Sequence, residues 1–255
     1  MIKKALAFVI LTVLAITAIA QKQLKPYSEW TEKEAQKILN DSPWAHTQVE
    51  TDTSEMVFNP SRETPVLSNS SVGARVARGE ENNIGGNRQV RGATNQATSV
   101  NYHIVFLSAR PIREAIARKV ELAQKTPNAE LSAQLRGFVE RNFADYIVVA
   151  VTFDTKDPRF ANAPNQAFAG ALLATIKNNT YLDRNDGKRL FLSQFIPPAS
   201  DGLGAKFVFA RNLDGKPFLT SEFSQVRFYS EVSKSVKLDQ RFKISDMQYN
   251  GRLEY

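Results

Sequence analysis

Residues 146–153 form a continuous apolar run rich in β-branched side chains, and no other stretch constrains the fold as strongly. Such a run predicts a strand buried in the centre of a sheet. Ahead of it, residues 100–107 alternate between apolar and polar side chains, which predicts another strand. Between the two strands, apolar residues recur with the 3.6-residue period of a helix in two successive stretches. Pro111 suits the first position of one helix, and residues 126–143 carry the second. The centre of the chain is therefore predicted to be strand, helix, helix and strand.

The chain after residue 153 is predicted to be mostly an antiparallel β-meander. Asp-Gly pairs at residues 186–187 and 214–215 lie between alternating runs and predict two hairpin turns of one kind. Residues 226–232 and 241–247 predict further strands. Residues 163–176 are ambiguous between helix and strand, with helix favoured at their start. The predicted fold class is α+β.

The first twenty residues have the pattern of a secretory signal peptide. Lys3 and Lys4 precede an uncharged apolar stretch at residues 5–20, which ends in small residues before the polar Gln21. The stretch is shorter than the roughly 20 residues that a membrane-spanning helix needs. We therefore expect cleavage between Ala20 and Gln21, and a mature chain in the periplasm or outside the cell with no transmembrane helix.

The chain contains no cysteine, which excludes disulfides and a lipid anchor on cysteine. An ordinary hydrophobic core must therefore stabilise the mature protein. Residues 21–58 predict an N-terminal helix, with Thr31 and Glu34 at capping-box spacing, followed by an extended segment. Residues 59–98 are rich in Gly, Ser, Asn and Arg and predict a mobile insertion. Residues 99–255 form the predicted main domain, on which residues 21–58 are expected to pack.

Charge and residue inventory exclude several classes of function. The net charge of +7 comes without a run of like charges, so we expect no nucleic-acid partner. With no cysteine and only His46 and His103, no metal site is expected, and each histidine is predicted to be structural or on the surface. No phosphate loop, dinucleotide motif or nucleophilic serine motif is present, and we expect no cofactor. The segment at residues 202–205 is predicted to be a flexible approach to a strand.

The remaining candidates for function are few. Asp154 and Asp157 follow the buried strand and are the carboxylates best placed for general acid or base chemistry. Asp157 precedes a proline, which also fits a turn. Arg110 and Arg113 at a helix start are candidates for holding an anion, although a surface salt bridge is the favoured explanation. Aromatic side chains dominate binding hot spots, and this makes Trp30 and Trp44 binding candidates, although most aromatics belong to a core.

Five blocks of the sequence together resemble a family of uncharacterised exported bacterial proteins. They are WTEKEAQKILNDSPWA at 30–45, SARPIREA at 108–115, SDGLGAKFVFAR at 200–211, VRFYSEV at 226–232 and FKISDMQYNGRLEY at 242–255. The resemblance implies export and a bacterial origin, and it transfers no functional site.

Two classes of function remain open. A non-catalytic envelope or secreted protein that binds an unknown protein or small ligand is favoured, because motifs for a nucleophile, a base and a metal are all missing. The alternative is a carboxylate-dependent hydrolase or another enzyme. The alternation of Tyr249, Gly251, Leu253 and Tyr255 resembles the final strand of outer-membrane proteins, so association with the outer membrane is a minor alternative.

Overall fold

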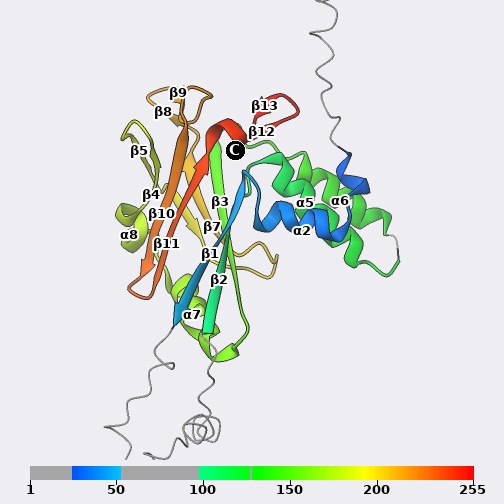
Figure 1. Cartoon of the computed structure of the whole chain (residues 1–255), viewed down its shortest axis with the longest axis horizontal. Coiled ribbons are helices and arrows are strands. Elements are labelled where there is room, and N and C mark those ends of the chain that lie inside the picture. The colour runs from blue at the N-terminus through cyan, green and yellow to red at the C-terminus, as the bar shows by residue number, and fades with distance from the viewer. Residues whose placement is uncertain (1–24, 53–97, 127) are drawn as a thin grey trace, which may run out of the picture.

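The computed structural model describes residues 25–52, 98–126 and 128–255. Two antiparallel sheets face each other around one apolar core, and three helices lie together on one side of them (Figure 1). The predicted fold class, α+β with mostly antiparallel strands and a short N-terminal helix, is confirmed. No helix in the described ranges is long and apolar enough to cross a membrane.

The larger sheet is built around the predicted central strand. Its five strands are, in spatial order, β1 (Ala45–Asp52), β2 (Thr98–Phe106), β3 (Tyr146–Thr155), β7 (Ala205–Ala210) and β6 (Gln194–Ile196). β3 is the middle strand, and its residues 147–151 are buried, which confirms the prediction from its apolar run. β2 begins at Thr98, so the last residue of the predicted insertion belongs to a strand. Residues 53–97, and with them nearly all of that insertion, lie outside the described residues.

The smaller sheet closes the other side of the core. Its order is β11 (Val236–Lys243), β10 (Gln225–Ser233), β4 (Thr180–Arg184) and β5 (Arg189–Phe191). Aromatic rings join the two sheets. Phe228 packs on Phe207 with their centroids 5.4 Å apart, and Phe242 packs edge-on against Phe106 at 4.8 Å.

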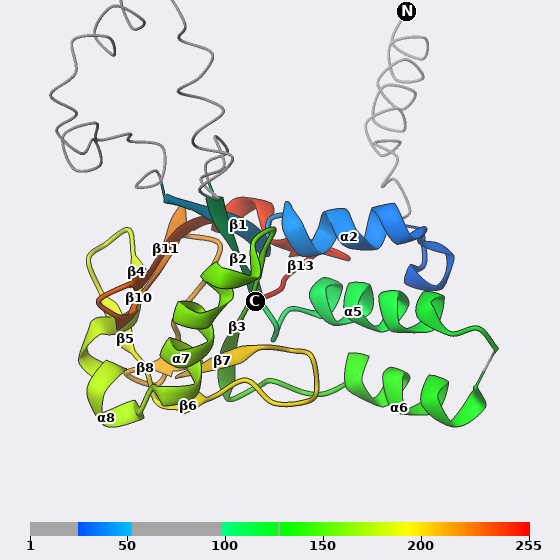
Figure 2. The same cartoon turned by 90° about the horizontal axis from the view of Figure 1, so that it is seen from below.

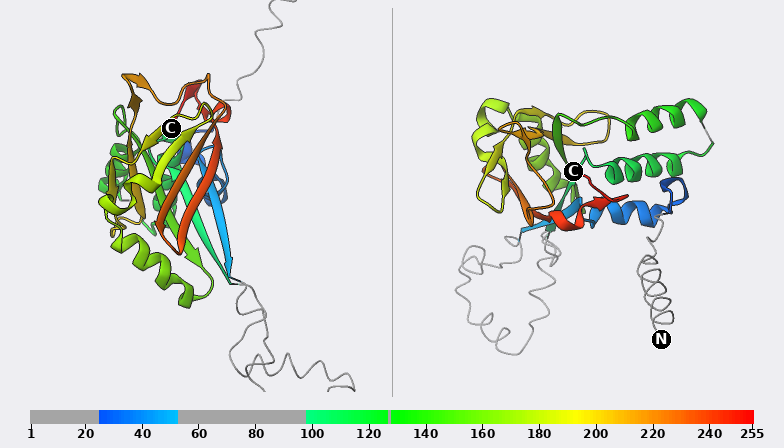
Figure 3. Two further views of the ribbon diagram at one scale, coloured as in Figure 1. Left: turned by 90° about the vertical axis from the view of Figure 1, so that its left-hand side faces the viewer. Right: turned by 90° about the horizontal axis from the view of Figure 1, so that it is seen from above.

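The edges of the two sheets meet where β1 lies beside β11 (Figure 3, left). The side-chain amide of Gln48 bridges them in the manner of a strand. Its Nε2 donates to the Lys237 carbonyl at 2.7 Å, and its Oε1 accepts from the Asp239 amide at 2.8 Å. One side chain therefore satisfies two backbone groups of an otherwise open sheet edge.

Helices α2 (Glu32–Asn40), α5 (Arg110–Ala123) and α6 (Ala129–Val139) lie one above another beside the sheets (Figure 2). The capping box of Thr31 and Glu34 is present at the start of α2. Asn128 caps α6, which ends at Val139 and not at residue 143 as predicted. The reason is local: the Asn142 side chain accepts from the Ala144 amide at 2.9 Å, a turn that competes with helix.

The ambiguous stretch at residues 163–176 is helical. It forms α7 (Asn162–Gly170) and α8 (Leu173–Ile176), which lie on the side of the sheets away from α5 and α6 (Figure 2). Short 3₁₀ turns complete the description: η1 (Tyr27–Glu29), η4 (Pro158–Ala161), η5 (Lys177–Asn179) and η6 (Ile244–Asp246).

The two Asp-Gly hairpins exist, but they are not of one kind. Asp214 and Gly215 both have positive φ, 53° and 74°, which is the two-residue turn joining β8 (Asn212–Leu213) to β9 (Lys216–Pro217). At the other turn only Gly187 has positive φ, because a third residue, Asn185, lengthens the loop between β4 and β5.

Two predictions about the final strands are wrong in position. The predicted strand at residues 241–247 is β11, which begins at Val236 and ends at Lys243. Ser233 starts the preceding turn by accepting from the Val236 amide at 3.1 Å. The alternation up to residue 255 is also not one strand. Asn250 and Gly251 turn the chain between β12 (Gln248–Tyr249) and β13 (Arg252–Leu253).

Candidate functional site

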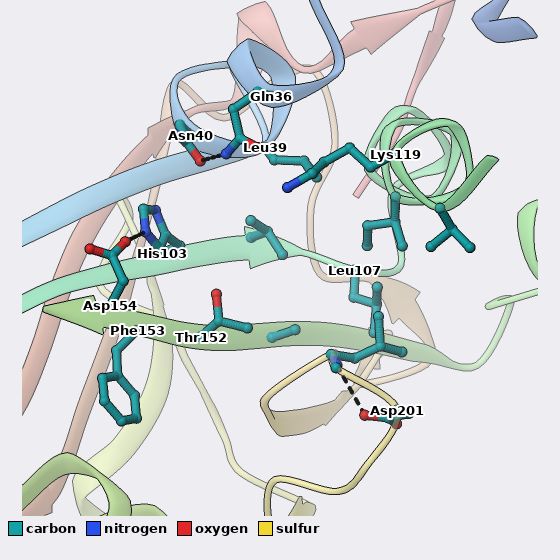
Figure 4. Close-up of a pocket in the computed structure, with 16 residues that line it drawn as sticks. Gln36, Leu39, Asn40, His103, Leu107, Lys119, Thr152, Phe153, Asp154 and Asp201 are labelled. Carbon is teal, nitrogen blue, oxygen red and sulfur yellow. Dashed lines mark hydrogen bonds and ion pairs between the residues drawn. The ribbon is translucent and has the colours of Figure 1, made fainter. Parts of the chain in front are cut away.

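A cavity of about 460 Å³ lies on the outer face of the larger sheet, beneath α2 and α5 (Figure 4). We call it the α2–α5 cavity. The strands β2 and β3 form its floor, and the loop before β7 forms one rim. Polar or charged side chains at its surface are Gln36, Asn40, His103, Lys119, Thr152, Asp154 and Asp201. The rest of the lining is mostly apolar, with Leu39, Val105, Leu107, Ile116, Val120, Ala150, Phe153 and Leu203.

The pairing register of the sheet brings the polar floor together. Alternate residues of a strand point to opposite faces, so the face away from the core receives His103 from β2 and Asp154 from β3. His103 Nε2 lies 2.5 Å from Asp154 Oδ2, and Asn101 Nδ2 donates to Asp154 Oδ1 at 2.9 Å. The hydrogen bond from His103 is the main cause that holds the pKa of Asp154 below its ordinary value, so Asp154 is a carboxylate at neutral pH.

The hydroxyl group of Thr47 continues this hydrogen-bond chain. Thr47 Oγ1 lies 3.0 Å from His103 Nδ1 and 3.2 Å from the Asn40 carbonyl oxygen. A neutral His103 that donates from Nε2 can accept a hydrogen bond from the Thr47 hydroxyl at Nδ1. A protonated His103 donates from both nitrogens, and the Thr47 hydroxyl must then donate to Asn40. The orientation of this hydroxyl therefore depends on the charge of His103.

Lys119 supplies a cation from the opposite wall. Its side chain extends from α5 into the space between α2 and β2 (Figure 4). It is half-buried, and among the described residues no carboxylate or carbonyl binds its ammonium group. Ile116 and Val120 on the same helix face line the cavity beside it. An ammonium group in such surroundings has lost part of its hydration without gaining a counter-ion.

The rim is fixed by a glycine and an ion pair. Lys206 Nζ lies 2.8 Å from Asp201 Oδ2, which holds the loop before β7 over the sheet. Gly204 has φ +71°, and a Cβ built on it would lie 2.2 Å from the Val151 carbonyl oxygen. The backbone of this loop therefore contacts β3 directly, and the segment is a packed rim.

The carboxylates predicted from the sequence are not brought into one site. Asp154 lines the α2–α5 cavity, but Asp157 does not. Asp157 caps the short turn η4 by accepting from the Arg159 amide, and its carboxylate binds the Arg159 guanidinium at 2.6 Å. The pKa of Asp157 is lowered, chiefly by that side-chain hydrogen bond. This position of Asp157 matches the turn that the following proline indicated.

The aromatic binding candidates belong to the packed interior. Trp30 and Trp44 are each 7% exposed. Their indole N–H groups are satisfied within the protein, Trp30 by the Lys25 carbonyl and Trp44 by the Glu254 carbonyl, both at 2.8 Å. Their edges line a second hollow of about 660 Å³, but these hydrogen bonds give both side chains a structural task.

The arginine candidates differ in burial and in their partners. Arg110 is exposed and pairs with Glu114 at 2.9 Å, and Glu114 is itself buried and accepts from the Tyr249 hydroxyl. Arg113 is buried and donates to the main-chain carbonyls of Ser108 and Val139. The expected salt bridge on the surface is therefore correct for one arginine only.

The geometry gives no support to a metal site in the described part of the chain, where no group of three or more His, Asp or Glu side chains could hold an ion. His46 and His103 point to opposite faces of the sheet, since Thr47 and not His46 is the partner of His103. The half-buried His46 packs at a tilt against the core residue Phe242 with their centroids 4.7 Å apart, and burial lowers its pKa.

Comparison with protein-family models, curated proteins and solved structures finds no match to this chain. The resemblance to exported bacterial proteins therefore stays a prediction. The feature of the molecule that bears on function is the α2–α5 cavity.

Sequence reasoning missed Lys119 and the role of His103. The signal for Lys119 was present, because it lies three residues after Ile116 and so interrupts the apolar stripe of its helix with a charge. His103 was visible as a polar residue on an alternating strand. Its partner Asp154 was not visible, because only the register of β2 against β3 pairs them.

Proposed function

We propose that this chain is an exported bacterial protein that binds a small amphipathic anion in the α2–α5 cavity and does not transform it. Lys119 is the observation that carries the proposal. The half-buried Lys119 carries its ammonium group into a cavity lined mostly by apolar side chains, with no counter-ion among the described residues, and a ligand carboxylate would supply one.

The rest of the cavity suits the remainder of such a ligand. Its volume of about 460 Å³ falls in the range of pockets that hold small molecules. Val105, Leu107 and Ile116 offer apolar surface to a hydrocarbon part. Gln36 and Asn40, which are hydrogen-bonded to each other at 2.8 Å, place an amide pair above Lys119 that can orient polar atoms.

An enzyme is the second candidate, and the chain of Thr47, His103 and Asp154 favours it. A histidine between a hydroxyl and a carboxylate is the arrangement that activates hydroxyl nucleophiles. Here, however, the Thr47 hydroxyl also lies within hydrogen-bond distance of the Asn40 carbonyl, and Thr47 is not part of the cavity lining. The carboxylate Asp154 is also held ionised, which makes it a poor general acid. Binding therefore explains more of the site than hydrolysis does.

The test uses a matched pair of probes, octanoate and octanol, in isothermal titration calorimetry of the mature protein. Octanoate is expected to bind at least about tenfold more tightly than octanol, because only octanoate supplies a charge for Lys119. In Lys119→Met the two probes should bind alike, with octanol affinity nearly unchanged. Lys33→Met, on the exposed face of α2, is the control for loss of one positive charge. Equal binding of the two probes to the unaltered protein, or an equal effect of both variants, would refute the proposal.

Export is tested separately. N-terminal sequencing of the protein recovered from its bacterial host should begin at Gln21. Recovery of the intact precursor in the cytoplasm would contradict it.

A further inference from the structure

Another cavity, of about 470 Å³, lies at the other end of α5 and shares no lining residue with the α2–α5 cavity. We call it the arginine cavity. It is surrounded by the end of α6 and the segment after it, the start of α5, the residue after β7, and the last two residues of the chain. Four arginines and two glutamates line it: Arg110, Arg113, Arg141, Arg211, Glu140 and Glu254.

Arg113 is the most buried of these arginines, with 5% of the residue exposed. Its Nε donates to the Val139 carbonyl at 3.0 Å, its Nη1 donates to the Ser108 carbonyl, and its guanidinium lies over the Phe143 ring. Within the described residues no carboxylate pairs with it. Burial is the main cause that lowers its pKa, to about 10; the Glu254 carboxylate raises it, and the like charges of Arg110 and Arg141 lower it. Arg110 and Arg141 therefore lie close enough to Arg113 to repel its guanidinium.

Arg211 is held in a similar way. Its Nη1 donates to the Phe143 carbonyl at 3.3 Å and to the main-chain oxygen of Tyr255 at 2.9 Å, and its guanidinium stacks on the Tyr255 ring at 3.8 Å. Main-chain oxygens and ring faces thus fix the direction of both guanidiniums. The Nη2 groups of both remain available, since the structure assigns them no partner among the residues it describes.

The start of α5 is not itself the binding element. Glu254 Oε2 already accepts from the Arg110 amide at 3.1 Å, and the Arg110 side chain pairs with Glu114. The sequence pointed to Arg110 and Arg113 as a pair, and the structure adds Arg141 and Arg211 to the same cavity lining. Arg141 is exposed at the cavity mouth.

We propose that the arginine cavity binds the phosphate monoester group of a ligand between Arg113, Arg141 and Arg211. A planar carboxylate is satisfied by one guanidinium fork, whereas a tetrahedral dianion can accept from donors that converge from several directions. The ligand charge would also offset the repulsion between Arg113 and Arg141.

The experiment follows the Nε–H signals of Arg113 and Arg211 by nuclear magnetic resonance during titration with inorganic phosphate at constant ionic strength. Both signals should shift along one saturable curve, and acetate should bind about tenfold more weakly. This readout needs no substitution at the buried Arg113, so it does not depend on the folding of a variant. Absence of a saturable shift at millimolar phosphate would overturn the proposal.

Two variants at the cavity mouth should change phosphate affinity in opposite directions. Arg141→Gln should weaken it about fivefold, and Glu254→Gln should strengthen it about threefold while keeping an oxygen for the Arg110 amide. Arg136→Gln, on the exposed face of α6 and outside the cavity, changes the net charge equally and should leave affinity unchanged. An equal loss in Arg136→Gln and Arg141→Gln would show non-specific attraction and overturn the proposal.

Cosedimentation with vesicles that contain phosphatidic acid distinguishes a phosphate group on a lipid from one on a soluble ligand. Cosedimentation that Arg141→Gln abolishes identifies a lipid headgroup. Saturable binding of free phosphate without cosedimentation identifies a soluble ligand. Both outcomes support the phosphate site, and neither bears on the α2–α5 cavity, whose test uses other probes and other variants.

Discussion

Gly204→Ala should destabilise the protein far more than Gly202→Ala, although the two glycines lie in the same loop with nearly the same backbone angle. Their φ values are +71° and +69°. A side chain at such an angle costs about 1–2 kcal/mol, and alanine returns about 0.4–1 kcal/mol by restricting the unfolded chain. Gly202 has open space around its added Cβ, so its substitution should cost about 1 kcal/mol or less.

The Gly204 substitution adds a steric cost to the same backbone cost. The new Cβ would lie 2.2 Å from the Val151 carbonyl oxygen and 2.8 Å from Thr152 Cγ2, where ordinary contacts are 3.4–4 Å. The Val151 carbonyl oxygen belongs to the backbone, and no side-chain rotation can move it. The rim must therefore move away from β3. Overpacking of this kind costs about 1–3 kcal/mol, which brings the total for Gly204→Ala to about 1–4 kcal/mol.

Urea unfolding of both variants and the unaltered protein measures the difference. The difference between the two variants isolates the contact with β3, because the backbone term is common to both. Gly204→Ala should also weaken octanoate binding, since Gly202 and Leu203 line the α2–α5 cavity. If Gly204→Ala is no less stable than Gly202→Ala, the close approach of this rim to β3 is wrong.

Two further predictions concern stability. Burial lowers the pKa of His46, so the unfolded chain binds a proton there before the folded one does. The contribution of His46 is therefore present above its unfolded pKa of about 6.5 and is lost as pH falls below that value. The urea midpoint should thus fall more for the unaltered protein than for His46→Phe between about pH 7.5 and 5.5, and parallel curves would contradict this. Gln48→Ala should cost about 1–3 kcal/mol, because two hydrogen bonds between the sheet edges are lost. Val49→Ala, at an exposed neighbour, is the control and should change stability by less than about 0.5 kcal/mol, and an equal loss in both variants would refute the bridge.

The sequence alone determined the elements whose signals are local. The apolar run of β3, the capping box at Thr31 and the amphipathic stripe of α5 each depend on residues a few positions apart, so they could be recognised without the fold. Local signals were also sufficient for the Asp-Gly turns. They failed where a competing side-chain hydrogen bond ended an element, as Asn142 does after α6 and Ser233 does before β11.

The tertiary structure alone decided which side chains share a site. Asp154 and Asp157 are three residues apart, yet the strand carries one to the cavity and a turn carries the other to Arg159. His103 meets Asp154 only through the register of two strands, and Lys119 shares a cavity with both only because α5 packs over that face. Arg113 and Arg211 come together through the return of the chain to the start of α5. Such long-range pairings depend on the packing of whole elements, and no pattern within a short window of sequence contains that information.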